Sequence, residues 1–201
     1  FVPGQIVSAL VDDDEHVALE AMSGRWSDRP NASRLGSDAR YETTVFKVSL
    51  EDGNRDEQIF ETGQNAFVVL DAHGVPVLEV RIEDETGEFG IYRVVDGASQ
   101  RLYSEVFEAE YPQIPGFTDN GEAVALDIPG VGIRRLEIAT GELSDYDLSG
   151  TGLSEASLMV DTVSREVIGY SSQGALPEQR FLRSDFTALR EELSGILTEA
   201  V

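Results

Sequence analysis

The two histidines of this chain, His16 and His73, are its clearest candidates for general bases or metal ligands. Each lies close to an aspartate of a predicted turn, and they occupy related places in successive repeats. A metal shared by both is geometrically conceivable, but the pair lacks the close spacing, such as His-x-x-x-His, that a two-histidine site uses. We therefore expect turn-capping or solvated histidines and no metal.

Two acidic runs, 12–15 and 83–85, could attract calcium because hard cations take several carboxylate oxygens. Neither run has the alternating Asp-x-Asp-x-Asp-Gly spacing that wraps oxygens around one ion. We expect solvated turns, with a calcium-dependent or carbohydrate-active protein as a weaker alternative.

A serine hydrolase requires a nucleophile on a sharp turn, commonly Gly-x-Ser-x-Gly, with a histidine and an acid within reach. Residues 150–154 and 169–174 contain glycine and serine without this pattern, and they are interpreted as turns at repeat junctions. The chain has no cysteine, which excludes disulfides and thiolate chemistry. We predict no catalytic, cofactor-binding or metal-binding residue and no cofactor.

The charge balance limits the partners that the chain can have. With 38 acidic and 15 basic side chains the formal charge is -23, so nucleic acid and anionic membranes should repel it. No apolar run approaches the roughly 20 residues of a membrane span, so we expect no membrane insertion. The N-terminal residues 1–6 contain neither an initiator methionine nor a signal pattern, and we expect a piece of a longer protein.

A repeat of about 44 residues is the most informative pattern. Strand-like runs end in turns at Gly53, Gly97 and Gly141, and the next interval falls at Asp185. A second landmark precedes each run: apolar residues, an aspartate and a polar turn. The four aspartates are Asp12, Asp71, Asp119 and Asp161. Aspartate suits this place because its side chain accepts hydrogen bonds from backbone N–H groups of a turn.

Each repeat divides into four short strands, for the second repeat 66–70, 75–82, 89–95 and 99–106. Four strands in 40–50 residues are typical of a β-propeller blade. The predicted fold class is therefore all-β: about four four-stranded antiparallel propeller-like blades, a partial propeller, with a C-terminal helix. A β-sandwich or another β-rich stack is the alternative. The repeats cover roughly 4–63, 64–108, 109–150 and 151–185, and the helix covers 185–200.

Two segments depart from the repeat. Residues 25–40 form a polar insertion, expected as a surface loop. Asp185 can cap a helix that we expect to pack on the repeat edge. Its apolar stripe comprises Phe186, Leu189, Leu193, Ile196 and Leu197.

The order of these motifs resembles the propeller of the prolyl oligopeptidase family of serine peptidases, especially bacterial dipeptidyl-aminopeptidase-like members. The similar stretches are 4–19, 45–53, 70–76, 116–121, 136–141, 160–162 and the helix over 189–201. The resemblance implies a propeller that caps an α/β-hydrolase domain and filters peptide access. That domain and its catalytic residues are missing here, so no residue role carries over.

The leading hypothesis is a non-catalytic segment that gates or scaffolds substrate access in a larger, periplasmic or secreted serine peptidase. Its partners would be the missing α/β-hydrolase domain, the remaining blades and a peptide substrate. The alternative is a stand-alone acidic binding module for a basic protein or peptide. An open arc of four repeats should either self-associate through its terminal faces or cover one with the helix. Aromatic residues that could add to a peptide surface, although core packing is favoured, are Tyr92, Tyr103, Tyr111, Phe117, Tyr146 and Tyr170.

Overall fold

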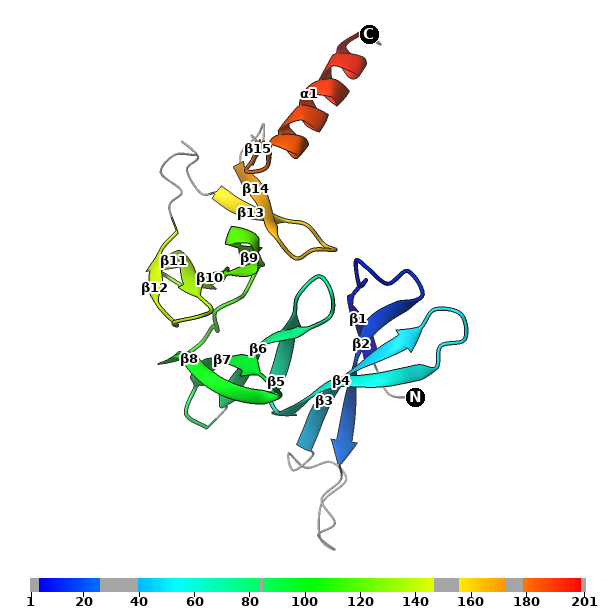
Figure 1. Cartoon of the computed structure of the whole chain (residues 1–201). Coiled ribbons are helices and arrows are strands. Elements are labelled where there is room, and N and C mark those ends of the chain that lie inside the picture. Colours follow the sequence, from blue (N-terminus) through cyan, green and yellow to red (C-terminus); the bar gives the residue numbers. More distant parts are fainter. Residues whose placement is uncertain (1–3, 26–39, 84, 147–155, 173–178, 200–201) are drawn as a thin grey trace, which may run out of the picture. The chain divides into compact units, whose positions relative to one another are not determined.

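The computed structural model describes residues 4–25, 40–83, 85–146, 156–172 and 179–199. The chain forms two compact units, Phe1–Tyr111 and Pro112–Val201. Four antiparallel sheets and one longer helix make up the described residues (Figure 1). None of the described helices is long and apolar enough to cross a membrane.

The first unit contains two four-stranded sheets, in each of which consecutive strands are neighbours. The first sheet comprises β1 (Gly4–Ser8), β2 (His16–Arg25), β3 (Arg40–Ser49) and β4 (Arg55–Gln64). The second comprises β5 (Ala66–Leu70), β6 (Pro76–Glu83), β7 (Glu88–Val95) and β8 (Ala98–Val106). The four strands of the second sheet coincide with the predicted ones to within one residue at each end. Residues 26–39, most of the predicted insertion, lie outside the described residues.

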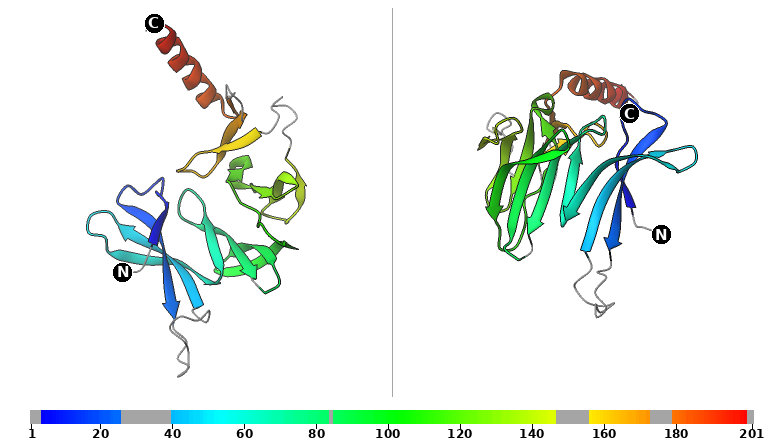
Figure 2. Two further views of the ribbon diagram at one scale, coloured as in Figure 1. Left: turned by 180° about the vertical axis from the view of Figure 1, so that it is seen from behind. Right: turned by 60° about the horizontal axis from the view of Figure 1, so that its bottom comes forward.

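The second unit contains a four-stranded sheet, a three-stranded sheet and the helix. The first sheet comprises β9 (Phe117–Thr118), β10 (Ala123–Ile128), β11 (Gly132–Glu137) and β12 (Leu143–Asp145), with the short 3-10 helix η1 (Asp119–Gly121) between β9 and β10. The second comprises β13 (Ala156–Val160), β14 (Val167–Ser172) and β15 (Gln179–Phe181), and α1 (Ser184–Glu199) follows. Consecutive strands are neighbours in these two sheets as well. Figure 2 shows the sheets and the helix from two further sides.

The repeat reflects one backbone turn that recurs between the third and fourth strands. Gly53, Gly97 and Gly141 have φ angles of +71°, +75° and +75°, in the left-handed region that glycine adopts at little cost. Asp185, the next position in the series, lies instead in the first turn of α1. The predicted all-β class of propeller-like sheets with a C-terminal helix is confirmed, but the fourth sheet has three strands in the described residues because α1 begins where the next hairpin would form.

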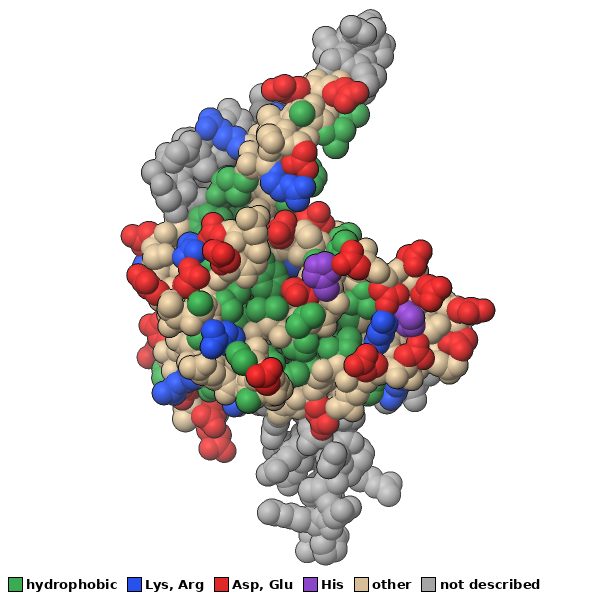
Figure 3. Space-filling view, viewed as in Figure 1, with side chains coloured by type: hydrophobic (Ala, Val, Ile, Leu, Met, Phe, Trp, Pro, Cys, Tyr) green, Lys and Arg blue, Asp and Glu red, His purple; other side chains and the backbone are tan. Residues whose placement is uncertain are grey.

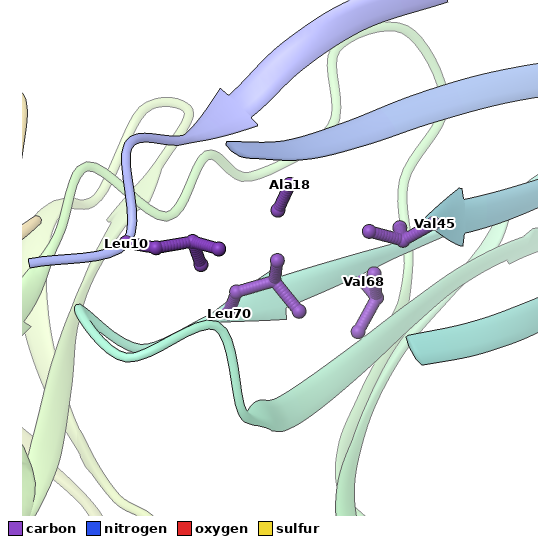
Figure 4. Packing of buried hydrophobic residues seen from close by; sticks show 5 residues of the cluster. All are labelled: Leu10, Ala18, Val45, Val68 and Leu70. Atoms are coloured by element: carbon purple, nitrogen blue, oxygen red, sulfur yellow. The ribbon is translucent and has the colours of Figure 1, made fainter. Parts of the chain in front are cut away.

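Apolar residues of both sheets form the core of the first unit. Leu10, Ala18, Val45, Val68 and Leu70 are buried against one another, and they come from the β1–β2 turn, β2, β3 and β5 (Figure 4). A backbone hydrogen bond from Val11 N to Ala72 O, 2.9 Å long, links the turns of the two sheets. Burial of the apolar faces therefore joins the two sheets, and it places the first turn of one beside the first turn of the other.

Candidate functional site

The first turns of the two sheets in unit 1 hold the histidines and an acidic run, and they form the candidate site. His16 opens β2, and Lys47 lies opposite Ala18 on β3. Because paired residues and alternate residues of a strand share a face, His16 and Lys47 lie on the same face as the buried Ala18 and Val45. The charged groups therefore sit where the apolar core ends.

His16 is held between two carboxylates. Its Nδ1 lies 2.8 Å from Asp13 Oδ1, and its Nε2 lies 2.8 Å from Asp56 Oδ2 on β4. Lys47 Nζ lies 2.5 Å from the other oxygen of Asp13. Since each ring nitrogen faces an acceptor, the arrangement favours the doubly protonated imidazolium. We call Asp13, His16, Lys47 and Asp56 the His16 cluster.

The pKa values of the His16 cluster follow from these contacts. The hydrogen bond with Asp13, followed by the one with Asp56, raises the pKa of His16. The hydrogen bond from Lys47, followed by the one from His16, holds the pKa of Asp13 well below its usual range. The bond to Asp13 also raises the pKa of Lys47. Each of these contacts therefore favours the charged form of its group.

His73 reaches the same turn from the second sheet. Its Nδ1 lies 2.7 Å from Asp12 Oδ2, the residue next to Asp13. The two histidines therefore contact neighbouring aspartates of one turn, and each has its own carboxylate partner. Among the described residues no group of three or more histidine, aspartate or glutamate side chains could hold a metal ion.

A pocket of about 360 Å³ lies on the acidic side of the turn. It is lined by Asp14, Glu15, His16, Ser49, Leu50 and Glu51. The charged side chains of its wall are therefore three carboxylates and His16, whose two ring nitrogens are already paired with Asp13 and Asp56. Figure 3 shows acidic side chains gathered around the histidines. The pocket can accept a cationic or hydrogen-bond-donating group.

The turn aspartates do not all play the predicted part. Asp71 Oδ1 accepts from His73 N and Val75 N at 2.9 and 2.8 Å, and Asp161 Oδ1 accepts from Val163 N at 2.8 Å, as expected. In the first turn Asp13 accepts from the Glu15 N–H, whereas Asp12 pairs with His73. Asp119 instead accepts from Arg135 Nε at 2.6 Å.

The other candidate segments lie elsewhere. Glu83 and Glu85 are exposed, and Asp84 lies outside the described residues, as do residues 150–154 and 173–174. Residues 169–172 belong to strand β14, so their interpretation as a junction turn was wrong. Gly169 is needed there because an added Cβ would lie 2.3 Å from the carbonyl oxygen of Arg180 on β15.

The aromatic residues serve mainly in packing. Phe117 and Tyr170 are buried. Tyr111 stacks on Phe89, and the Tyr146 ring meets the edge of Tyr170 with centroids 6.3 Å apart. Tyr92 lies under the Arg81 guanidinium, whereas Tyr103 donates a hydrogen bond to Glu105.

Lys47 and Asp56 were not singled out from the sequence. A signal was available, because the hairpin around Gly53 places Lys47 opposite Glu57 and so brings both residues toward the His16 end of the sheet. The contact to Asp56 additionally depends on the irregular pairing of β3 with β4 between Lys47 and Val48.

The electrostatic arrangement predicts a measurable shift of the His16 titration. We expect its pKa, measured by NMR from the imidazole carbon-bound protons, to lie above the ordinary value of about 6.5 and to fall in Asp13→Asn and Asp56→Asn. Asp14→Asn removes the same charge from the same turn, but Asp14 makes no hydrogen bond to His16, so this variant should change the pKa of His16 little.

A raised folded-state pKa of His16 stabilises the fold below about pH 6.5, and this contribution is lost as pH rises through the folded value. The lowered pKa of Asp13 adds stability above about pH 4 that is lost on further acidification, so the contribution of the His16 cluster to thermal stability should be greatest between about pH 4 and 6.5. A His16 titration at or below the ordinary value would contradict the cluster.

Comparison with known proteins supports the fold alone. No protein-family model matches the chain, and no curated protein matches it in sequence. A crystal structure of an uncharacterized protein from Listeria monocytogenes is similar in fold, with a TM-score of 0.50 and 12% sequence identity over 90% of this chain. This chain spans about half, 51%, of the length of that protein.

Proposed function

We propose that this chain is a non-catalytic, propeller-like binding segment whose acidic pocket in the first unit takes a basic side chain of a partner protein or peptide. The observation that carries the proposal is the lining of the pocket. Asp14, Glu15 and Glu51 surround it, and no lysine or arginine lines it in the described part of the chain. The nearby Lys47 is already paired with Asp13, so the carboxylates of the pocket keep their charge for a ligand.

The net charge of the chain supports the same partner class. At -23 the chain attracts cations over distances set by the ionic strength, and it speeds association with a basic partner. Long-range attraction brings the partner to the surface, whereas the pocket specifies where one lysine or arginine would enter. The long-range attraction and the pocket can be separated by two variants that lose the same number of carboxylates, one at the pocket and one elsewhere.

A binding assay with a fluorescein-labelled hexalysine peptide tests the proposal. The triple variant Asp14→Asn, Glu15→Gln, Glu51→Gln should bind about 3- to 150-fold more weakly, since three exposed ion pairs contribute roughly 0.2–1 kcal/mol each. The matched control neutralises three exposed carboxylates elsewhere in unit 1, Glu85, Asp96 and Glu105, and it should bind nearly as the wild type. Equal losses of affinity in both triple variants would show that only the overall charge attracts the peptide, and they would contradict binding in the pocket.

The role of a substrate-gating segment in a larger serine peptidase stays a second proposal. It is favoured by the order of the two landmarks in four successive repeats, and the fold similarity to part of a longer protein is compatible with it. The full reading frame decides: a continuation into a Gly-x-Ser-x-Gly elbow supports it, and the absence of a hydrolase domain contradicts it. Under either proposal the chain alone should not hydrolyse dipeptidyl or prolyl chromogenic substrates.

A further inference from the structure

The outer edge of β15 carries no strand in the described part of the chain. In the other three sheets a fourth strand, β4, β8 or β12, pairs with the third strand, whereas the last sheet ends at β15. The Leu182 N–H donates to Ile168 O, so this residue and Arg180 direct their backbone groups toward β14. Because neighbouring residues of a strand alternate, Gln179 and Phe181 direct theirs to the uncovered side.

A groove follows this edge between β15 and α1. Two adjoining pockets of about 540 and 260 Å³ share Gln179, Phe181, Arg190 and Ser194 as lining residues. The smaller one also contains Phe186, Leu189 and Leu193. The rings of Phe181 and Phe186 stack at 5.8 Å, and Leu189 and Leu193 remain 51% and 50% exposed. The expectation that the helix would hide its stripe on the repeat edge is therefore wrong for these two leucines, which form a wall of the groove.

We propose that this groove binds an extended segment of a partner polypeptide, which adds to β15 as the fourth antiparallel strand of the sheet. The sister sheets of this chain show what covers the corresponding edge: an antiparallel strand of three to ten residues. Exposed strand edges recognise peptides in this way, through backbone hydrogen bonds for affinity and side-chain pockets for specificity.

The sister sheet in the same unit indicates the side chains of the occupant. There Leu143 of β12 lies opposite Leu136, and Asp145 of β12 pairs with Arg134 at 3.2 Å. A corresponding occupant would place an apolar side chain against the Phe181 and leucine wall and a carboxylate near the arginines of the groove.

The charges of the groove favour the same occupant. Arg180 and Arg190 line it together with one carboxylate, Glu191, in a chain whose net charge is -23. Arg190 donates to the edge carbonyl of Gln179, which is an acceptor that the N–H of an added strand would use. An incoming strand can therefore take over this carbonyl while the released guanidinium meets its carboxylate. A second copy of the chain is a poorer occupant because its own fourth strands are paired and its charge is repulsive.

A labelled heptapeptide with the sequence of residues 140–146, which contains β12, is a suitable probe for the full chain. We expect saturable binding that weakens about tenfold or more in Leu189→Ala/Leu193→Ala, since each 1.4 kcal/mol of lost contact is a factor of ten. Val131→Ala is the matched control, because Val131 is a similarly exposed apolar residue, 61%, in the same unit and lines neither pocket of the groove. A peptide whose alternate backbone nitrogens are methylated should lose binding, since it cannot complete the β ladder.

Three results would overturn the proposal. The first is that neither the wild type nor the variants bind the peptide saturably, although their circular dichroism spectra show that they are folded. The second is equal binding of the methylated peptide, which would show side-chain capture without strand addition. The third is a dimer in sedimentation velocity that the leucine substitutions abolish, which would make a second copy the occupant. The groove lies in the second unit, so these results leave the acidic pocket of the first unit unaffected.

Discussion

Replacing Phe89 by alanine should lower the free energy of unfolding of the first unit by about 3–5 kcal/mol, the range for aromatic truncations in protein cores. Phe89 lies on β7 and is 1% exposed. Its ring meets Phe107 edge-on with centroids 6.1 Å apart and stacks on Tyr111 at 6.3 Å. Truncation removes these contacts and leaves a cavity between the second sheet and the segment that follows it.

Urea denaturation of the full chain, followed by circular dichroism, measures this loss. Phe67→Ala is the control, because Phe67 lies in the same sheet but is 38% exposed, and its truncation should cost about 1–2 kcal/mol. Similar losses in both variants would contradict the placement of Phe89 in the core. The acidic pocket should still bind hexalysine in any folded fraction of Phe89→Ala, since Phe89 is not one of the residues that line it.

Arg81→Met should lower the free energy of unfolding by about 2–3 kcal/mol at neutral pH, because it removes the counter-charge of the buried Glu79. Glu79 is 3% exposed, and Arg81 reaches it with Nε at 3.0 Å and Nη2 at 2.7 Å. Ser99 of β8 also donates to Glu79. We place the cost below the full range for buried pairs because the Arg81 side chain is 46% exposed and water can partly replace it.

The pH dependence distinguishes this mechanism from lost packing. Burial acts to raise the pKa of Glu79, but hydrogen bonds from Arg81 and Ser99 outweigh it and lower the pKa. The wild type therefore gains stability above the unfolded pKa of about 4.3, and this gain is lost on acidification, so the difference between wild type and Arg81→Met should shrink below about pH 4.

Two further variants complete this test. Adding Glu79→Gln should restore part of the loss, because a neutral side chain needs no counter-charge. Arg101→Met breaks a 3.6 Å surface pair with Glu88, and it should change stability by less than about 1 kcal/mol. A pH-independent loss in Arg81→Met would contradict the ion-pair explanation.

The local part of the fold followed from the sequence because hairpins are governed by neighbouring residues. The second sheet was predicted nearly strand by strand, since alternation as in Leu78 and Val80 marks one buried face and a glycine with positive φ marks each turn. The end of the series was not predictable from spacing. At Asp185 the same interval contains a residue that suits a helix start, and the helix expected from there is observed as α1. The spacing did not show that the sheet before this helix has three strands in the described residues.

The candidate site was predictable only in part. The sequence singled out His16, His73 and the acidic turn, but the contacts among them join residues far apart in the chain. The contact of His16 with Asp56 spans 40 residues and that of His73 with Asp12 spans 61, and both depend on how strands and sheets pair. Strand pairing places residues across a hairpin, whereas packing of two apolar faces decides which turns become neighbours.

The sequence by itself determined the strand period, the turn positions and the strong negative charge, because these depend on side-chain type and on spacing along the chain. The tertiary structure alone decided that carboxylates hold His16 at both nitrogens and that no strand among the described residues pairs with the outer edge of β15. It also decided that Leu189 and Leu193 line a groove. The physical reason is that hydrogen bonding between strands and burial of apolar surface act between residues whose distance in sequence carries no information about their distance in space.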